Sequence, residues 1–290
     1  MSGERRSRAS RDDHRASRDD HRASPQTMGQ VRRMRQIRQV RRAFRRKYFA
    51  LRVKRMTMTL FYPMAAKCPR CEKLFHHVPL DVAAPQLCSD CDRDVEPLTS
   101  GICSVCGRKT ANGICRECAK GVHSFFAARA YASYDGTAEH LIKALKYQED
   151  FRVLPILQTW ICDAYAAHYG YFDMIALVPV PMSIEKERSR GFNLSYELAR
   201  AVARRFRLPM IEPLLRIAQD KSQTVLHGCE RRNAMEHVFR CVDDARSLVG
   251  RHPYLLIVDD VLTTGGTADA CARRLFEVGA QSVEVLTIAR

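Results

Sequence analysis

Residues 255–267 combine an apolar run, two carboxylates and a turn rich in hydroxyl groups. Leu255–Val258 reads as a buried strand, and Asp259 and Asp260 follow it directly. Adjacent carboxylates can accept hydrogen bonds from ribose hydroxyls or help to organise Mg²⁺. The turn that follows opens a helical pattern, where N–H groups and the helix dipole favour a bound phosphate. The residues that we assign to this phosphate are Thr263, Thr264, Gly265, Gly266 and Thr267. The segment therefore predicts a site for a phosphorylated sugar, and a solvated surface turn is the alternative.

Two further segments carry cations that suit a pyrophosphate. Val178–Pro181 ends a strand and enters a predicted loop that carries Lys186, Arg188 and Arg190. Guanidinium groups match phosphate oxygens in pairs. The alternative for this segment is a solvated basic loop.

The second cationic segment spans residues 220–233 and contains Lys221 and Arg231. It is polar and lies between predicted elements, so we interpret it as a mobile lid that brings cations over the leaving group. An ordinary surface loop is the alternative.

Eight of the twelve cysteines form four C-x-x-C pairs. The pairs are Cys68/Cys71, Cys88/Cys91, Cys103/Cys106 and Cys115/Cys118. Two such pairs complete one four-sulfur site, so four pairs predict two zinc sites, with sequential pairing favoured over interleaved pairing and an iron–sulfur cluster as the weaker alternative. Four thiolates leave no coordination position open for water, which makes the zinc structural rather than catalytic.

Elements with alternating periodicity must position these residues. Apolar strands are predicted at 174–180, 255–258 and 283–288, and amphipathic helices at 138–146, 153–168, 193–206 and 267–278. Continuous apolar strands separated by helices predict an α/β fold with a Rossmann-type parallel sheet and helices on both faces.

Charge is concentrated near the N-terminus. Residues 1–57 hold 19 Lys or Arg and 5 Asp or Glu, a net charge of +14 out of +16 for the chain. The sequence RASRDDH occurs twice before residue 22, which predicts disorder. Apolar residues then recur with helical spacing at Val31, Met34, Ile37, Val40, Phe44, Tyr48 and Leu51. Three interpretations stay open for this segment: a helix on an anionic membrane or nucleic acid, a helix packed on its own protein, and a translation start placed too early.

No apolar run is long enough for a transmembrane helix, and no signal peptide is evident. Together with the paired cysteines this predicts a cytoplasmic protein. We divide the chain into a basic, largely disordered tail with a candidate amphipathic helix (1–57), a double zinc ribbon (64–122) and a ligand-binding domain (123–290).

The segment 255–267 resembles the 5-phosphoribosyl-1-pyrophosphate (PRPP) signature of type I phosphoribosyltransferases. Further strings resemble the ComF/GntX family: VPVP at 178–181, RGFN at 190–193, the Gln223–Asn233 stretch and the final Ala289-Arg290. The resemblance covers about residues 64–290. One departure is Leu194, where the family usually has glutamine.

The resemblance implies a phosphoribosyltransferase-like domain that binds PRPP with Mg²⁺ and transfers phosphoribose to a nitrogen nucleophile, releasing pyrophosphate. It implies Asp259 and Asp260 on the ribose hydroxyls, the threonine turn on the 5-phosphate, and Arg188 and Arg190 on the pyrophosphate. Residues 130–147 are a candidate hood over the nucleophile. The alternative function is a non-catalytic competence or DNA-uptake protein that binds PRPP or single-stranded DNA. Competence proteins and an anionic surface on the basic tail are further candidate partners.

Overall fold

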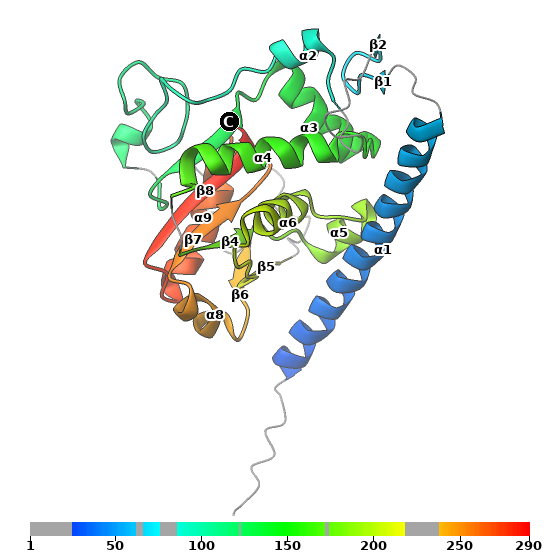
Figure 1. The fold of residues 1–290 in the computed structure, drawn as a ribbon. Helices are drawn as coiled ribbons and strands as arrows, with labels where there is room; N and C mark the ends of the chain where they lie inside the picture. Colours follow the sequence, from blue (N-terminus) through cyan, green and yellow to red (C-terminus); the bar gives the residue numbers. More distant parts are fainter. Residues whose placement is uncertain (1–24, 62–65, 76–85, 122, 172–173, 218–237) are drawn as a thin grey trace, which may run out of the picture.

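The computed structural model describes residues 25–61, 66–75, 86–121, 123–171, 174–217 and 238–290 (Figure 1). Its centre is a parallel sheet of four strands in the order β3-β8-β7-β4. These strands are β3 (Ala128–Ala132), β4 (Ile175–Pro179), β7 (Tyr254–Val258) and β8 (Ser282–Ala289). The predicted α/β fold with a parallel sheet is therefore confirmed.

Helices cover both faces of this sheet, as alternating residues of β7 show. Leu256 and Val258 lie in a core shared with α3 (Gly136–Gln148), α4 (Leu154–Tyr169) and α6 (Leu194–Phe206). Leu255 and Ile257 lie in a second core on the opposite face. That core is closed by α8 (Ala245–Arg251), α9 (Gly266–Glu277) and the antiparallel pair β5 (Leu214–Arg216) and β6 (Phe239–Cys241). Burial on both faces explains why the strands read as continuous apolar runs.

The cysteine-rich segment packs beside the sheet domain. It contains the short strands β1 (Ala66–Lys67) and β2 (Leu74–Phe75), the helix α2 (Ser89–Arg93) and a 3-10 turn at Cys118–Lys120. Its eight paired cysteines form two groups of four, as a double zinc ribbon requires. The two groups are Cys68, Cys71, Cys88 and Cys91, and Cys103, Cys106, Cys115 and Cys118.

One predicted loop is a helix in the structure. The cationic segment after β4 forms α5 (Ile184–Arg190), and so the prediction of a loop there was wrong. Ser183 caps this helix by accepting a hydrogen bond from the N–H of Lys186, and Gly191 ends it with φ of 84°. These capping residues are sequence signals for a short helix. The helix was not predicted, because its seven residues show no helical spacing of apolar residues.

The basic N-terminal segment forms the long helix α1 (Pro25–Phe61), which crosses the boundary that we set at residue 57. It lies along the side of the molecule against α5 (Figure 1). Ile37 and Phe44 are buried against the protein, whereas Val31 and Leu51 remain exposed. Of the three interpretations left open, packing on its own protein is the one that the structure shows. Among the described residues, no helix is both long and apolar enough to cross a membrane.

Candidate functional site

The two adjacent carboxylates lie at the carboxyl end of β7 with separate partners. Asp259 Oδ1 accepts hydrogen bonds from Ser195 Oγ at 2.8 Å and from the N–H of Asp260 at 2.9 Å. Burial and the neighbouring charge of Asp260 raise the pKa of Asp259 to about 7, although these hydrogen bonds and Lys146 act in the opposite direction. The raised pKa means that Asp259 holds its proton to a higher pH than an exposed aspartate does.

Asp260 is paired with a lysine from the far side of the pocket. Lys146 Nζ lies 2.6 Å from Asp260 Oδ1, and both side chains are largely buried. Lys146 belongs to the last turn of α3, within the segment 130–147 that we expected to form a hood. This pair connects α3 to the end of β7.

Three further cations face the carboxylates. Lys186 and Arg190 come from α5, and Arg216 ends β5. The pKa of Lys186 is lowered, first by loss of hydration and then by the positive charges of Arg190, Arg216 and Lys146. A group of like charges held together in this way is a ready site for a multivalent anion.

These groups line one open pocket of about 320 Å³. Its walls come from the ends of β4 and β7, the start of α6 and the end of α3. The lining residues are Tyr134, Lys146, Tyr147, Val180, Pro181, Met182, Lys186, Arg190, Asn193, Ser195, Arg216, Asp259, Asp260, Val261, Thr263 and Thr267. A pocket outside the carboxyl ends of parallel strands is where open α/β sheets bind their ligands.

The turn between β7 and α9 has the geometry expected for a phosphate cradle. Gly265 adopts φ of 85° immediately before α9, whose first N–H groups have no partner within the helix. A Cβ atom on Gly265 would come within 2.7 Å of the His123 ring, so no larger residue fits. Thr263 and Thr267 line the pocket, and Thr264 and Gly266 lie between them in the same turn.

His123 and Asp269 form contacts beside this turn that fix the start of α9. His123 Nδ1 lies 2.9 Å from Asp269 Oδ2, and the N–H of Ser124 donates to Asp269 Oδ1 at 2.7 Å. Asp269 is 4% exposed in the first turn of α9. The segment that leaves the second cysteine cluster is thereby fixed to the start of α9.

The last residue of the chain makes a second link of this kind. Arg290 Nε donates to the carbonyl oxygen of Cys106 at 2.7 Å. Its Nη1 donates to the carbonyl oxygen of Leu262 at 2.9 Å and also contacts that of Thr263. Arg290 therefore joins a cysteine knuckle to the backbone of the turn that precedes α9.

The structure brings together most, but not all, of the residues that we predicted. Asp259, Asp260, Thr263, Thr267 and Arg190 line one pocket. Arg188 lies on the same helix as Arg190, but its side chain is exposed and does not line the pocket. Lys221 and Arg231 lie outside the described residues.

Two polar residues of the pocket were missed by the sequence analysis. Ser195 gave no signal, because a serine in the first turn of a helix is usually a cap rather than a ligand. Arg216 ends a three-residue strand and belongs to none of the motifs. Leu194, which stands where the family usually has glutamine, is buried in the core, and its neighbour Ser195 contacts Asp259 instead.

The two cysteine clusters have the geometry of metal sites. Within each cluster all four sulfur atoms lie within 4.8 Å of one another, and the grouping is the sequential one that we predicted. Burial raises the pKa of Cys103, but N–H groups of the knuckle, including that of Cys115 at 3.3 Å, outweigh it and lower the value to about 6. A thiolate at neutral pH is the form that binds a metal ion.

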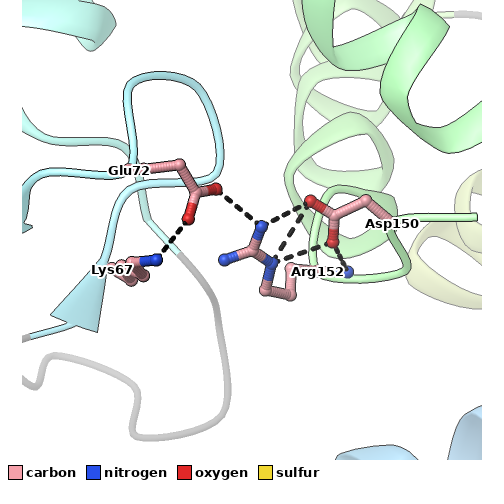
Figure 2. Close-up of polar contacts among 4 residues, drawn as sticks. All are labelled: Lys67, Glu72, Asp150 and Arg152. Carbon is pink, nitrogen blue, oxygen red and sulfur yellow. Dashed lines mark hydrogen bonds and ion pairs between the residues drawn. The ribbon is translucent and has the colours of Figure 1, made fainter. Parts of the chain in front are cut away.

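Charged contacts tie the first cluster to the sheet domain (Figure 2). Arg152 donates to Asp150 beside it and reaches Glu72, one residue after Cys71, at 2.9 Å. Lys67 also pairs with Glu72 at 2.8 Å. Together, Lys67 and Arg152 lower the pKa of Glu72 to about 2. The cluster is thereby held against the loop between α3 and α4.

Curated proteins with similar sequences share one theme. The chain is 25% identical over 213 residues to competence protein ComFC of Bacillus subtilis, which covers 71% of this chain and 84% of that protein. It is 25% identical over 231 residues to competence protein F of Haemophilus influenzae, covering 77% and 96%. It is 27% identical over 229 residues to DNA utilization protein YhgH of Escherichia coli K12, covering 72% and 99%. No protein-family model matches the chain. These similarities, to a chain with two four-cysteine clusters before a parallel α/β domain, support membership of the ComF family.

Proposed function

We propose that this protein binds PRPP with Mg²⁺ and transfers phosphoribose to a nitrogen nucleophile, releasing pyrophosphate. The observation that carries the proposal is the convergence of three groups on one pocket. An acid pair, a threonine turn at a helix start and a cluster of cations face each other at the ends of β4 and β7. PRPP has a ribose diol, a 5-phosphate and a pyrophosphate, and each of these suits one of the three groups.

The assigned roles follow from the chemistry of each group. Thr263–Thr267 and the start of α9 hold the 5-phosphate. Asp259 and Asp260 accept hydrogen bonds from the ribose hydroxyls. Ionisation of Asp259 makes it a stronger acceptor, and the contact with Lys146 orients the Asp260 side chain. Mg²⁺ bound with the substrate supplies further neutralisation of the pyrophosphate charge.

Lys186, Arg190 and Arg216 stabilise the leaving group. Negative charge accumulates on the pyrophosphate as the bond to the ribose anomeric carbon breaks, while positive charge develops on the sugar. Cations that are already in place stabilise this separation without reorganising water. The side chain of Arg188 is exposed and does not line the pocket, so we assign it no direct contact with the pyrophosphate.

The nucleophile would enter past two tyrosines. Tyr134 and Tyr147 line the pocket, and Tyr147 is 74% exposed beside Lys146. An exposed ring at a pocket mouth offers a stacking surface for a planar heterocycle. We therefore favour a planar nitrogen base over ammonia as the nucleophile.

The cysteine clusters fit structural zinc. Each offers four sulfur ligands and no open position, so zinc would stabilise the fold and take no part in the transfer. Both proposals in this section assume a cytoplasmic protein, where unpaired thiols stay reduced.

The direct test is calorimetric titration of PRPP with Mg²⁺ into the full chain, beside an Asp259→Asn/Asp260→Asn variant. The full chain is needed because α1 packs against α5. Binding that is lost in the folded variant supports the site, with Asp243→Asn, an exposed aspartate, as the matched control. A folded, zinc-loaded parent that binds no PRPP would refute the proposal. Binding justifies a screen of amines and bases for release of pyrophosphate.

The names of the relatives refer to competence and DNA utilization, which motivates a second proposal, a non-catalytic role in handling DNA. The outward face of α1 carries exposed arginines and no acidic residue. The exposed arginines of this face are Arg35, Arg38, Arg42 and Arg46. Binding of single-stranded DNA should then weaken with salt, and each arginine removed should reduce the log–log slope by about 0.7. PRPP binding without release of pyrophosphate for any nucleophile, together with this salt dependence, favours the second proposal over the first.

A further inference from the structure

Helix α1 lies outside the region of family resemblance, yet it packs against the helix that supplies two of the pocket cations (Figure 1). Its sequence reads as a basic tail, and most of its arginines are exposed. One of them, Arg41, is only 4% exposed. A buried arginine on an otherwise solvated basic helix requires specific partners, because an unpaired buried charge is strongly unfavourable.

Arg41 has three partners, which belong to different elements. Its Nε donates to Glu187 Oε1 at 2.8 Å, and its Nη1 donates to Glu212 Oε2 at 2.7 Å. Its guanidinium also lies 3.6 Å from the centre of the Tyr196 ring. Glu187 is 1% exposed, so its carboxylate depends on Arg41 for neutralisation.

The two glutamates flank the cations of the pocket. Glu187 follows Lys186 on α5, and Arg190 lies one turn further along the same helix. Glu212 lies just before β5, which ends at Arg216. Arg41 therefore connects the two elements from which Lys186, Arg190 and Arg216 project.

Aromatic packing supports the same junction. Phe44, one helical turn after Arg41, stacks on Phe192 with ring centres 5.0 Å apart. Phe192 is fully buried between Gly191, which ends α5, and Asn193, which lines the pocket. The end of α5 is thus held by α1 on the side away from the ligand.

A small cavity behind the pocket wall marks the contact with α1. Residues of α1, Ile37 and Arg41 among them, line it together with Pro181, Met182 and Arg216. These last three residues also line the candidate PRPP pocket. One layer of residues therefore separates α1 from the ligand site.

We propose that α1 is a working part of the PRPP site, with Arg41 as a positioning residue that holds α5 and β5 so that their cations converge on the pyrophosphate. This inference rests on the proposed function for the identity of the ligand. The contacts of Arg41 with Glu187 and Glu212 do not depend on the identity of the ligand. A basic helix whose arginines were all exposed would not hold α5 and β5 in this way.

The test compares Arg41→Met with Arg42→Met in the full chain. Arg42 is the next residue, is exposed and carries the same charge, so it controls for net charge and for helix composition. Arg41→Lys keeps a buried cation but lacks the planar fork that reaches both glutamates, and so it covers the case in which Arg41→Met does not fold. Two ligands are titrated with Mg²⁺ by calorimetry: inorganic pyrophosphate, and ribose 5-phosphate, which lacks the pyrophosphate. Hydrogen exchange of residues 184–191 and 214–216 is measured without ligand.

The expected result is a split between the two ligands. Arg41→Met should weaken pyrophosphate binding by about tenfold, leave ribose 5-phosphate within about twofold of the parent, and speed exchange in α5 and β5. Arg41→Lys should show the same pattern to a smaller degree, and Arg42→Met should match the parent. A variant that is only less stable would bind both ligands more weakly, to a similar degree.

The remaining outcomes distinguish a failure of the positioning role of Arg41 from a failure of the PRPP site. Unchanged exchange in α5 and β5 for Arg41→Met and Arg41→Lys overturns the positioning role, whatever the ligands do. Equal weakening of both ligands also overturns it. Faster exchange in a protein whose parent binds neither ligand supports the contact and refutes the PRPP site instead.

Discussion

Asp259 should make the ligand-free protein less stable at neutral pH than at pH 5, and Asp259→Asn should relieve this. The pKa of Asp259 is raised from 3.8 to about 7, chiefly by burial and then by the charge of Asp260. Between these two values the folded protein binds more protons at this position than the unfolded chain does. Stability from this group is therefore full below about pH 4 and is lost as the pH rises towards 7. Asparagine does not ionise, and its carbonyl oxygen can still accept the hydrogen bonds of Ser195 and Asp260.

The magnitude follows from the two pKa values. Linkage between 3.8 and about 7 implies that the variant gains about 2–3 kcal/mol over the parent between pH 5 and pH 8. For a domain of this size, about 1 kcal/mol corresponds to about 2–4 °C in Tm. The advantage in Tm should therefore widen by about 4–12 °C over this pH range.

Thermal unfolding monitored by circular dichroism at pH 5, 6, 7 and 8, without PRPP, measures this difference. Titrating groups that do not interact with Asp259 are common to the two proteins and cancel in the comparison. Asp243→Asn, at an exposed position, should show no such trend. A Tm difference that is flat with pH, or that favours the parent at pH 8, would refute the reasoning about Asp259. Loss of PRPP binding in the same stabilised variant would identify the carboxylate as one that is kept for function at a cost in stability.

Three further predictions concern the pocket and its supports. Arg216→Met should weaken binding of pyrophosphate with Mg²⁺ by about 10- to 100-fold in calorimetry, because it removes a charged hydrogen-bond donor, whereas exposed Arg188→Met should change it by less than about threefold. Equal effects of the two substitutions would contradict the placement of Arg188 outside the pocket. Arg290→Met should weaken ribose 5-phosphate binding by about tenfold while leaving the zinc content unchanged, since it frees the phosphate turn from the second cluster. Cys103→Ser should halve the zinc content measured by mass spectrometry and lower the Tm. It should also weaken the binding of ribose 5-phosphate, because Arg290 joins this cluster to the phosphate turn. Full zinc content would contradict the assignment of Cys103 as a ligand.

Part of the site could be predicted because its residues are neighbours in sequence. A strand, two carboxylates and a threonine turn follow one another within residues 255–267, so local geometry alone places Asp259, Thr263 and Thr267 at one strand end. The cysteine pairs were equally readable, because two-residue spacing brings two thiolates to one metal. The parallel sheet followed from apolar runs that only burial on both faces explains.

The remaining contacts join residues that no local pattern relates. Ser195 reaches Asp259 across 64 positions and Lys146 reaches Asp260 across 114. Arg41 is one arginine among many in a basic segment, and only the packing of α1 on α5 shows that it is buried. The final Arg290 looks like a chain end and proves to join a cysteine knuckle to the phosphate turn.

The sequence by itself determined the chemical groups that this protein offers: a threonine and glycine turn at a helix start, an acid pair and two four-cysteine clusters. Each of these is a short-range pattern, in which covalent spacing fixes the geometry. Only the tertiary structure decided which cations line the pocket with the acid pair, and that Arg41 of the basic N-terminal helix is buried against Glu187 and Glu212. Those choices depend on which helix faces pack together, and the burial of a charge such as Arg41 is settled by partners far away in the chain.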